Sequence, residues 1–79
     1  FNVMPNPNTG AFQIQVAFSH TRTTNLRLIN VLGQVLREYN FTEQNFSVPI
    51  DIQEQGGGVY FVALRSEEKT TTRKVTITK

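Results

Sequence analysis

The sequence has no cysteine, no tryptophan and a single histidine among its 79 residues. The absence of cysteine excludes disulfides and thiolate chemistry, and it removes the commonest ligand of structural zinc sites. No apolar run approaches the roughly 20 residues that a membrane-spanning helix needs, so we expect no membrane span. Charged residues make up 18% and hydrophobic residues 38% of the chain, a balance typical of a folded rather than a disordered protein.

The length limits the chain to one small domain, residues 1–79. A chain of this size buries only about 60% of the surface that its unfolded form exposes, so we expect a thin core. The sequence begins with Phe1 instead of methionine. We therefore expect it to be a piece of a longer protein, and the end of that protein.

Charge is weak but unevenly distributed along the chain. Residues 1–59 carry three arginines and four carboxylates, whereas residues 60–79 carry five lysines and arginines and two carboxylates. A nucleic-acid site would cluster such bases with exposed aromatics or glycines, but here they are spread along a threonine-rich stretch. We expect a solvated edge of a sheet and no nucleic-acid partner.

Hydrophobic residues recur with the period of two that is typical of half-buried strands. Strands are predicted at 12–18, 26–31, 35–41, 46–52, 59–64 and 70–79. Pro49 has no N–H for a sheet ladder, so its strand should lie at an edge, whereas 59–64 is apolar on both faces and should be central. The predicted core residues are Phe12, Ile14, Val16, Leu26, Leu28, Tyr60, Val62, Leu64, Val75 and Ile77.

Turn residues separate these segments at intervals of about 8–12 residues, which is the spacing of an all-β sandwich or small barrel. Residues 5–10 predict a rigid turn, because proline fixes φ and Asn8 and Gly10 tolerate left-handed geometry. Residues 66–69 predict a short charged hairpin loop.

One segment has two interpretations. Leu32, Val35 and Leu36 stand at helical spacing, but Gly33 and the β-branched Val31 disfavour a helix. A tight reversal at 32–34 between two strands is the favoured prediction.

The sequence offers little for catalysis. His20 is the sole imidazole, and its neighbour Ser19 points away from it in any strand or extended loop, so the two form no dyad. Asp51 and Glu54 leave a calcium site conceivable but lack the usual run of oxygen ligands. We predict no catalytic residue, no metal site and no cofactor.

Residues 56–58 are three successive glycines, which could suggest a phosphate-binding loop. Such a loop is followed by a helix N-terminus, whereas a strand is predicted here from residue 59. The glycines are better explained by a loop that needs positive φ.

Four motifs stand in order across nearly the whole chain. They are Met4-Pro5-Asn6-Pro7-Asn8-Thr9-Gly10, Leu28-Ile29-Asn30-Val31-Leu32-Gly33-Gln34-Val35, Ile50-Asp51-Ile52 with Gly58-Val59-Tyr60-Phe61-Val62, and Lys74-Val75-Thr76-Ile77-Thr78-Lys79. No single motif is specific, but in this order and spacing the chain resembles the C-terminal sorting domain of proteins exported by the type IX (Por) secretion system of Bacteroidetes.

The resemblance implies an immunoglobulin-like antiparallel β-sandwich of about seven strands that acts as an address and not as an enzyme. It implies that a cargo domain precedes the chain and that the precursor passes through the periplasm. The partners would be the outer-membrane translocon and a sortase-like surface peptidase that cuts at or before Phe1. The cargo would finish at the cell surface or outside the cell.

The resemblance also marks residues. Pro5, Asn6, Pro7 and Gly10 would shape the first turn or be recognised directly, Leu32 and Tyr60 belong to the matching motifs, and Gly33 and Gly58 would meet backbone requirements. Lys74 to Lys79 would offer a free strand edge to the secretion machinery, although Val75 and Ile77 could instead serve to close the core. Gln55, Gly56 and Gly57 depart from the family pattern, which implies a looser loop.

Two other functions stay open. A carbohydrate-binding or adhesive sandwich would need an exposed aromatic platform, and the chain has only two tyrosines and no tryptophan. A structural spacer needs no site at all. Position separates them, because only a sorting signal must end its protein.

Overall fold

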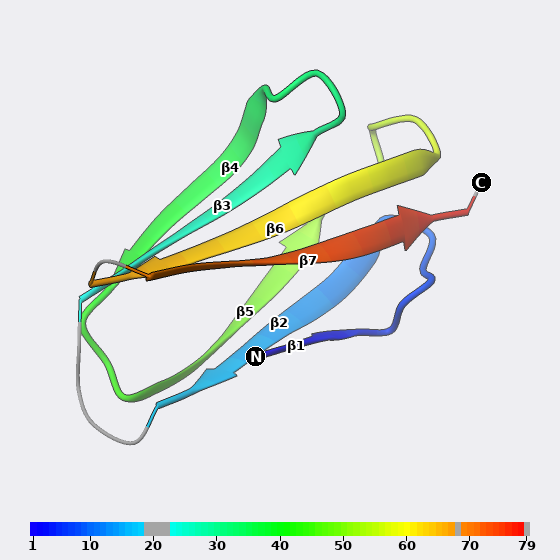
Figure 1. Cartoon of the computed structure of the whole chain (residues 1–79). Helices are drawn as coiled ribbons and strands as arrows, with labels where there is room; N and C mark the ends of the chain where they lie inside the picture. The colour runs from blue at the N-terminus through cyan, green and yellow to red at the C-terminus, as the bar shows by residue number, and fades with distance from the viewer. Residues whose placement is uncertain (19–22, 68, 79) are drawn as a thin grey trace.

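The computed structural model describes residues 1–18, 23–67 and 69–78, which form two antiparallel sheets packed as a sandwich (Figure 1). The strands are β1 (Asn2–Met4), β2 (Ala11–Ala17), β3 (Thr24–Asn30), β4 (Val35–Phe41), β5 (Asn45–Asp51), β6 (Gly58–Ser66) and β7 (Lys69–Ile77). One sheet has the order β1-β2-β5 and the other β4-β3-β6-β7. This is the connectivity of an immunoglobulin-like sandwich. The strands β3, β6 and β7 take the places of immunoglobulin strands C, F and G, and β4 joins their sheet beside β3. The predicted all-β class is confirmed.

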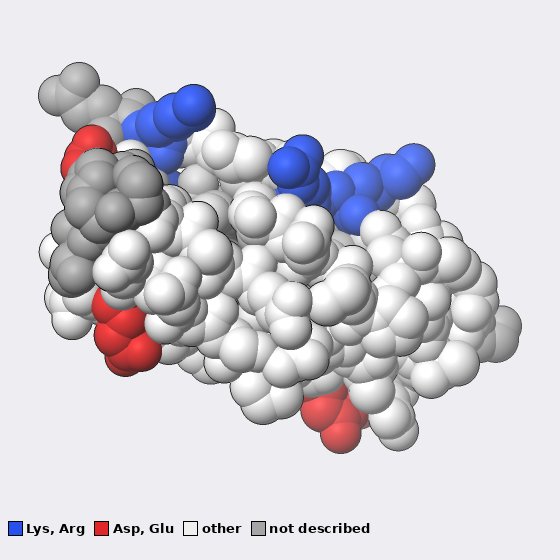
Figure 2. All heavy atoms as spheres, turned by 90° about the horizontal axis from the view of Figure 1, so that it is seen from below, with Lys and Arg blue, Asp and Glu red and all other residues white. Residues whose placement is uncertain are grey.

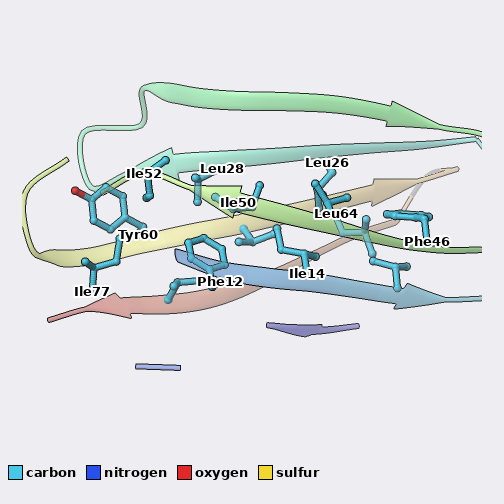
Figure 3. Close-up of a cluster of buried hydrophobic side chains, with 14 residues drawn as sticks. Phe12, Ile14, Leu26, Leu28, Phe46, Ile50, Ile52, Tyr60, Leu64 and Ile77 are labelled. Atoms are coloured by element: carbon cyan, nitrogen blue, oxygen red, sulfur yellow. The ribbon is translucent and has the colours of Figure 1, made fainter. Parts of the chain in front are cut away.

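The core lies between the sheets and is built by the alternation seen in the sequence (Figure 3). In β2 and β5 every second residue is buried, as expected for strands with one face on a core. All ten residues predicted for the core are buried, and four residues of β5 and its end join them. These are Phe46, Val48, Ile50 and Ile52.

Strand positions also follow from local chemistry. Pro49 lies in β5, which is an edge strand, opposite Gln13 of β2. β6, whose sequence is apolar on both faces, lies between β3 and β7, so both of its edges are paired. Both predictions are confirmed. The structure adds β1, a strand too short for an alternating pattern, which pairs with β2 from Asn2 opposite Gln15 to Met4 opposite Gln13.

The segment after β3 is a turn and not a helix. Residues 31–34 reverse the chain between β3 and β4, and Gly33 adopts a φ of 83°. The strand–turn–strand prediction is therefore confirmed. At the opposite end of the molecule Glu67, with a φ of 58°, follows the last residue of β6.

Some predictions concern residues outside the described ranges. Ser19 and His20 are among them, as are Glu68 of the predicted charged loop and Lys79. Within the described ranges, no helix is long and apolar enough to cross a membrane.

Candidate functional site

Four segments that are far apart in the sequence meet at one end of the sandwich (Figure 1). The register places Gly58 opposite Ile77 and Asn30 opposite Tyr60, and Asn8 forms an isolated bridge with Ile77. We call this end the motif end: residues 4–10, 30–35, 52–60 and 74–78. It contains parts of all four sequence motifs, so the fold assembles them into one surface.

Two asparagines fasten the first turn to the outer edge of β7, and we call Asn6 and Asn8 the asparagine latch. The Thr76 N–H donates to Asn6 Oδ1 at 3.0 Å, and Asn6 Nδ2 donates to the Lys74 carbonyl at 3.1 Å. The Asn8 N–H donates to the Thr76 carbonyl at 3.0 Å, and the Thr78 N–H donates to the Asn8 carbonyl at 2.7 Å. The latch therefore occupies the outward backbone groups of β7 from the Lys74 carbonyl to the Thr78 N–H.

The latch overturns one prediction from the sequence. The edge expected to be free for strand addition over Lys74–Lys79 is already hydrogen-bonded to Asn6 and Asn8 as far as Thr78. Val75 and Ile77 point into the core, with exposed fractions of 0% and 2%. At the C-terminal end of β7 only side chains on the outer face, such as that of Lys74, are left for a partner to contact.

The buried member of the latch, Asn8, also organises the turn that carries it. Asn8 is only 6% exposed, and both ends of its side-chain amide are hydrogen-bonded. Nδ2 donates to the Pro5 carbonyl at 2.9 Å, and Oδ1 accepts from the Gly10 N–H at 2.8 Å. Asn8 does not adopt the left-handed geometry that the sequence allowed, whereas Gly10 has a φ of 111°. Sequence reasoning missed the burial of Asn8; the signal was an asparagine placed two residues before a turn glycine.

Gly10 joins this turn to the end of β5, within the three-stranded sheet. Its carbonyl accepts a hydrogen bond from the Ile52 N–H at 2.8 Å. A Cβ atom at this position would lie 2.9 Å from Gln53 Cα, a contact that only a backbone shift could relieve. The motif glycine is thus required both by its conformation and by the close approach of the chain after β5.

The turn between β3 and β4 is held rigid by Asn30, another residue that sequence reasoning missed. Asn30 Oδ1 accepts from the N–H groups of Leu32 and Gln34, each at 3.0 Å, and the Asn30 carbonyl accepts from the Gly33 N–H at 3.0 Å. An asparagine at the first position of a turn is the local signal for such capping. We call residues 31–34 the hairpin tip.

The hairpin tip presents apolar side chains to solvent. Leu32 is 79% exposed and Val31 is 68% exposed. Among the residues that the structure describes, the other exposed large hydrophobics are Met4 and Val35, which also lie at the motif end. A hollow of about 250 Å³ lies beside the tip, between Asn30–Leu32 and Gly57–Tyr60. The exposed apolar side chains gathered at this end make it the candidate interaction surface.

Tyr60 supports the opposite wall of this hollow. Its ring is buried in the core and its hydroxyl donates to the Gly56 carbonyl at 2.5 Å (Figure 3). The loop before Gly58, expected to be loose, is further closed by a hydrogen bond from the Gln55 N–H to the Ile52 carbonyl at 2.9 Å. Gly58 follows with a φ of 141°, so both motif residues have a role in shaping the backbone.

Comparison of the sequence with protein families identifies the family of the whole chain. A family model described as the secretion system C-terminal sorting domain matches residues 2–78. The chain belongs to this family. Its members are C-terminal sorting signals for type IX secretion, which exports proteins across the outer membrane to the cell surface or beyond, and they are non-catalytic in general. No curated protein matches the chain.

Two acidic groups of this sorting domain, Asp51 and Glu54, make local contacts. Asp51 Oδ1 accepts from the Gln53 N–H at 3.1 Å, while Glu54 Oε1 lies 2.9 Å from Arg37 Nη2. The pKa of Glu54 is lowered by a hydrogen bond from its own backbone N–H and by Arg37, so this carboxyl is ionised at neutral pH. Within the described ranges, no three His, Asp or Glu side chains are close enough to hold a metal ion.

Glu38 is a second carboxyl with a lowered pKa. Hydrogen bonds from Asn25 and Arg27 lower it, at Nδ2–Oε2 and Nε–Oε2 distances of 2.9 and 3.0 Å. A general acid needs a pKa raised toward the working pH. Both shifts run in the opposite direction, so neither carboxyl is suited to that role.

The positive φ angles of Gly33 and Gly58 lead to a stability prediction. Valine at either position would have ample space, since no atom lies within 4 Å of the Cβ site, but its backbone would be strained. We expect Gly33→Val and Gly58→Val each to lower the free energy of unfolding by about 1–3 kcal/mol in chemical denaturation. Gly56→Ala is the matched control, because its φ is not positive and its surroundings are open. Valine variants as stable as the parent would show that the motif glycines have no backbone role.

Proposed function

We propose that the sorting domain is recognised through its motif end, where the hairpin tip docks on the outer-membrane translocon. The observation that carries this proposal is Leu32. It belongs to one of the four motifs and is 79% exposed, yet Asn30 and Gly33 fix the turn that displays it. An apolar side chain held rigidly in solvent adds nothing to the core, and it would gain free energy when a partner covers it.

The other motif residues have a supporting role in this proposal. Asn6, Asn8 and Gly10 fasten the first turn to β7 and β5, and Tyr60 and Gly58 shape the loop beside the tip. Because the latch already pairs with β7, the translocon reads side chains and turns here instead of adding a strand over residues 74–78. Lys74 contributes an exposed charge to this end, and Lys79 follows it in the sequence.

The remaining steps of the pathway complete the proposal. The domain, residues 1–79, ends its protein and follows a cargo domain, and the precursor crosses the periplasm before export. A sortase-like surface peptidase then cuts at or before Phe1, so the domain is a substrate and not an enzyme, and it uses no cofactor and no nucleic acid.

Neither tyrosine offers the exposed platform that the carbohydrate-binding alternative needs. Tyr60 is buried, and Tyr39 stacks on Phe41 with ring centres 6.2 Å apart. Both Tyr39 and Phe41 pack against the core and are half-buried. These three rings are thus used inside the sandwich rather than as a platform for a sugar.

Export of a fused reporter tests the sorting function. We expect the intact chain, fused to the C-terminus of a periplasmic reporter in a bacterium with type IX secretion, to deliver the reporter to the surface or the medium. A photoreactive amino acid at position 32 should cross-link to an outer-membrane protein. The same group at the exposed Glu43 should not, because the connection between β4 and β5 lies at the other end of the sandwich. Retention of the fusion in the periplasm, in cells that export the same reporter on an authentic sorting domain, would refute the function. Export without a cross-link specific to position 32 would refute the role of the tip alone.

A further inference from the structure

The half of β7 that lies away from the motif end keeps an unpaired edge. The latch bonds to the N–H and C=O of Thr76, and alternate residues of a strand direct these groups to the same side, so those of Thr70 and Thr72 also face outward. β7 is the last strand of its sheet. Among the described residues, no backbone group pairs with Thr70 or Thr72 on that side. These groups form a short template for another strand.

A cavity of about 310 Å³ lies on the inner side of the same stretch of β7. Phe1, Phe18 and Leu64 supply its apolar lining. Ser66 also lines it, and although this residue is 6% exposed, its Oγ has no hydrogen-bond partner among the described residues. The apolar part of the lining suits an apolar side chain of a ligand.

The rim of the cavity is positively charged. Lys69 and Arg73 line it, and Lys74 follows on the outer face. The Arg73 guanidinium lies 5.5 Å from the centre of the Phe1 ring. Lys and Arg side chains gather along one margin of the molecule in Figure 2. Like charges disfavour pairing of this edge with a second copy of the chain, whereas an acidic partner is complementary to it.

We propose that this half of β7 binds an extended acidic peptide segment. The segment adds to the edge as a fifth strand of the four-stranded sheet, paired with the outward groups of Thr70 and Thr72. One apolar side chain enters the cavity, and carboxylates on either side of it meet Lys69 and Arg73. Main-chain hydrogen bonds supply affinity in this mode of recognition, and the pocket and charges supply specificity. The site lies at the end opposite the hairpin tip, so it is independent of the proposed docking of the motif end.

Titration of the 15N-labelled chain with the peptide acetyl-Glu-Thr-Leu-Thr-Glu-amide tests the site. We expect saturable shifts of amide signals confined to residues 64–74 and Phe18. Arg73→Glu and Thr72→Pro should each weaken binding about tenfold, the first by reversing a contacting charge and the second by removing an outward N–H without touching the β6 ladder. Arg27→Glu, which reverses a charge on β3, two strands away from this edge, is the matched control and should bind as the parent does.

Four results would overturn the proposal. They are shifts at the motif end instead of β7, equal binding of acetyl-Lys-Thr-Leu-Thr-Lys-amide, equal binding of acetyl-Glu-amide alone, and no shift at saturating peptide. The third result would mean a simple anion site. Self-association through β7 in the absence of peptide would be a fifth contradicting result, because a second copy would then be the natural occupant.

Discussion

Replacing Asn8 by alanine should cost the sorting domain about 2–4 kcal/mol of unfolding free energy, a large part of the total for a chain of this size. The side chain satisfies the Pro5 carbonyl and the Gly10 N–H inside the fold, and alanine would leave both without a partner. The substitution would also free the turn that pairs with Thr76 and Thr78. The effect should therefore spread to the edge of β7.

Thermal unfolding followed by circular dichroism measures this loss. For a domain of this length each kcal/mol corresponds to a change of about 4–8 °C in Tm. Asn45→Ala is the matched control, since Asn45 is an exposed asparagine at the start of β5 and its removal should shift Tm by no more than about 3 °C. If the two variants melt together, the latch does not stabilise the fold.

The strands could be predicted because burial sorts their residues by face. β2 and β5 each place one face on the core, so buried apolar residues alternate with exposed residues along their sequences. β1 could not be predicted in this way, because three residues cannot show a period and its place is set by pairing with β2. Propensity alone could not settle the hairpin tip, but Gly33 at a φ of 83° explains why a turn was the better interpretation.

The site could be predicted only in part, because its decisive contacts join residues that are distant in sequence. The motifs identified Asn6 and Lys74, but nothing local shows that Asn6 caps a strand 70 residues away. The prediction of a free edge over Lys74–Lys79 was wrong for this reason. An edge strand can be recognised from its composition, but the residues that hydrogen-bond to its edge cannot. The exposure of Leu32 also depends on the fold, because an apolar residue in a motif is more often buried.

Substitution of Leu32 should separate recognition from stability. Leu32→Asp places a charge where we expect the translocon to cover an apolar side chain, so export should fall on the order of tenfold or more. Because the side chain is 79% exposed, the free energy of unfolding should change by no more than about 0.5 kcal/mol. Thr42→Asp introduces the same charge at an exposed position at the opposite end of the sandwich and serves as the control.

Export yield and Tm measured together on the parent, Leu32→Asp and Thr42→Asp fusions test the central claim most directly. We predict three proteins with the same Tm, of which only the Leu32→Asp fusion stays inside the cell. Export of a folded Leu32→Asp fusion at the parent's level would contradict the claim that the hairpin tip is what the secretion machinery reads.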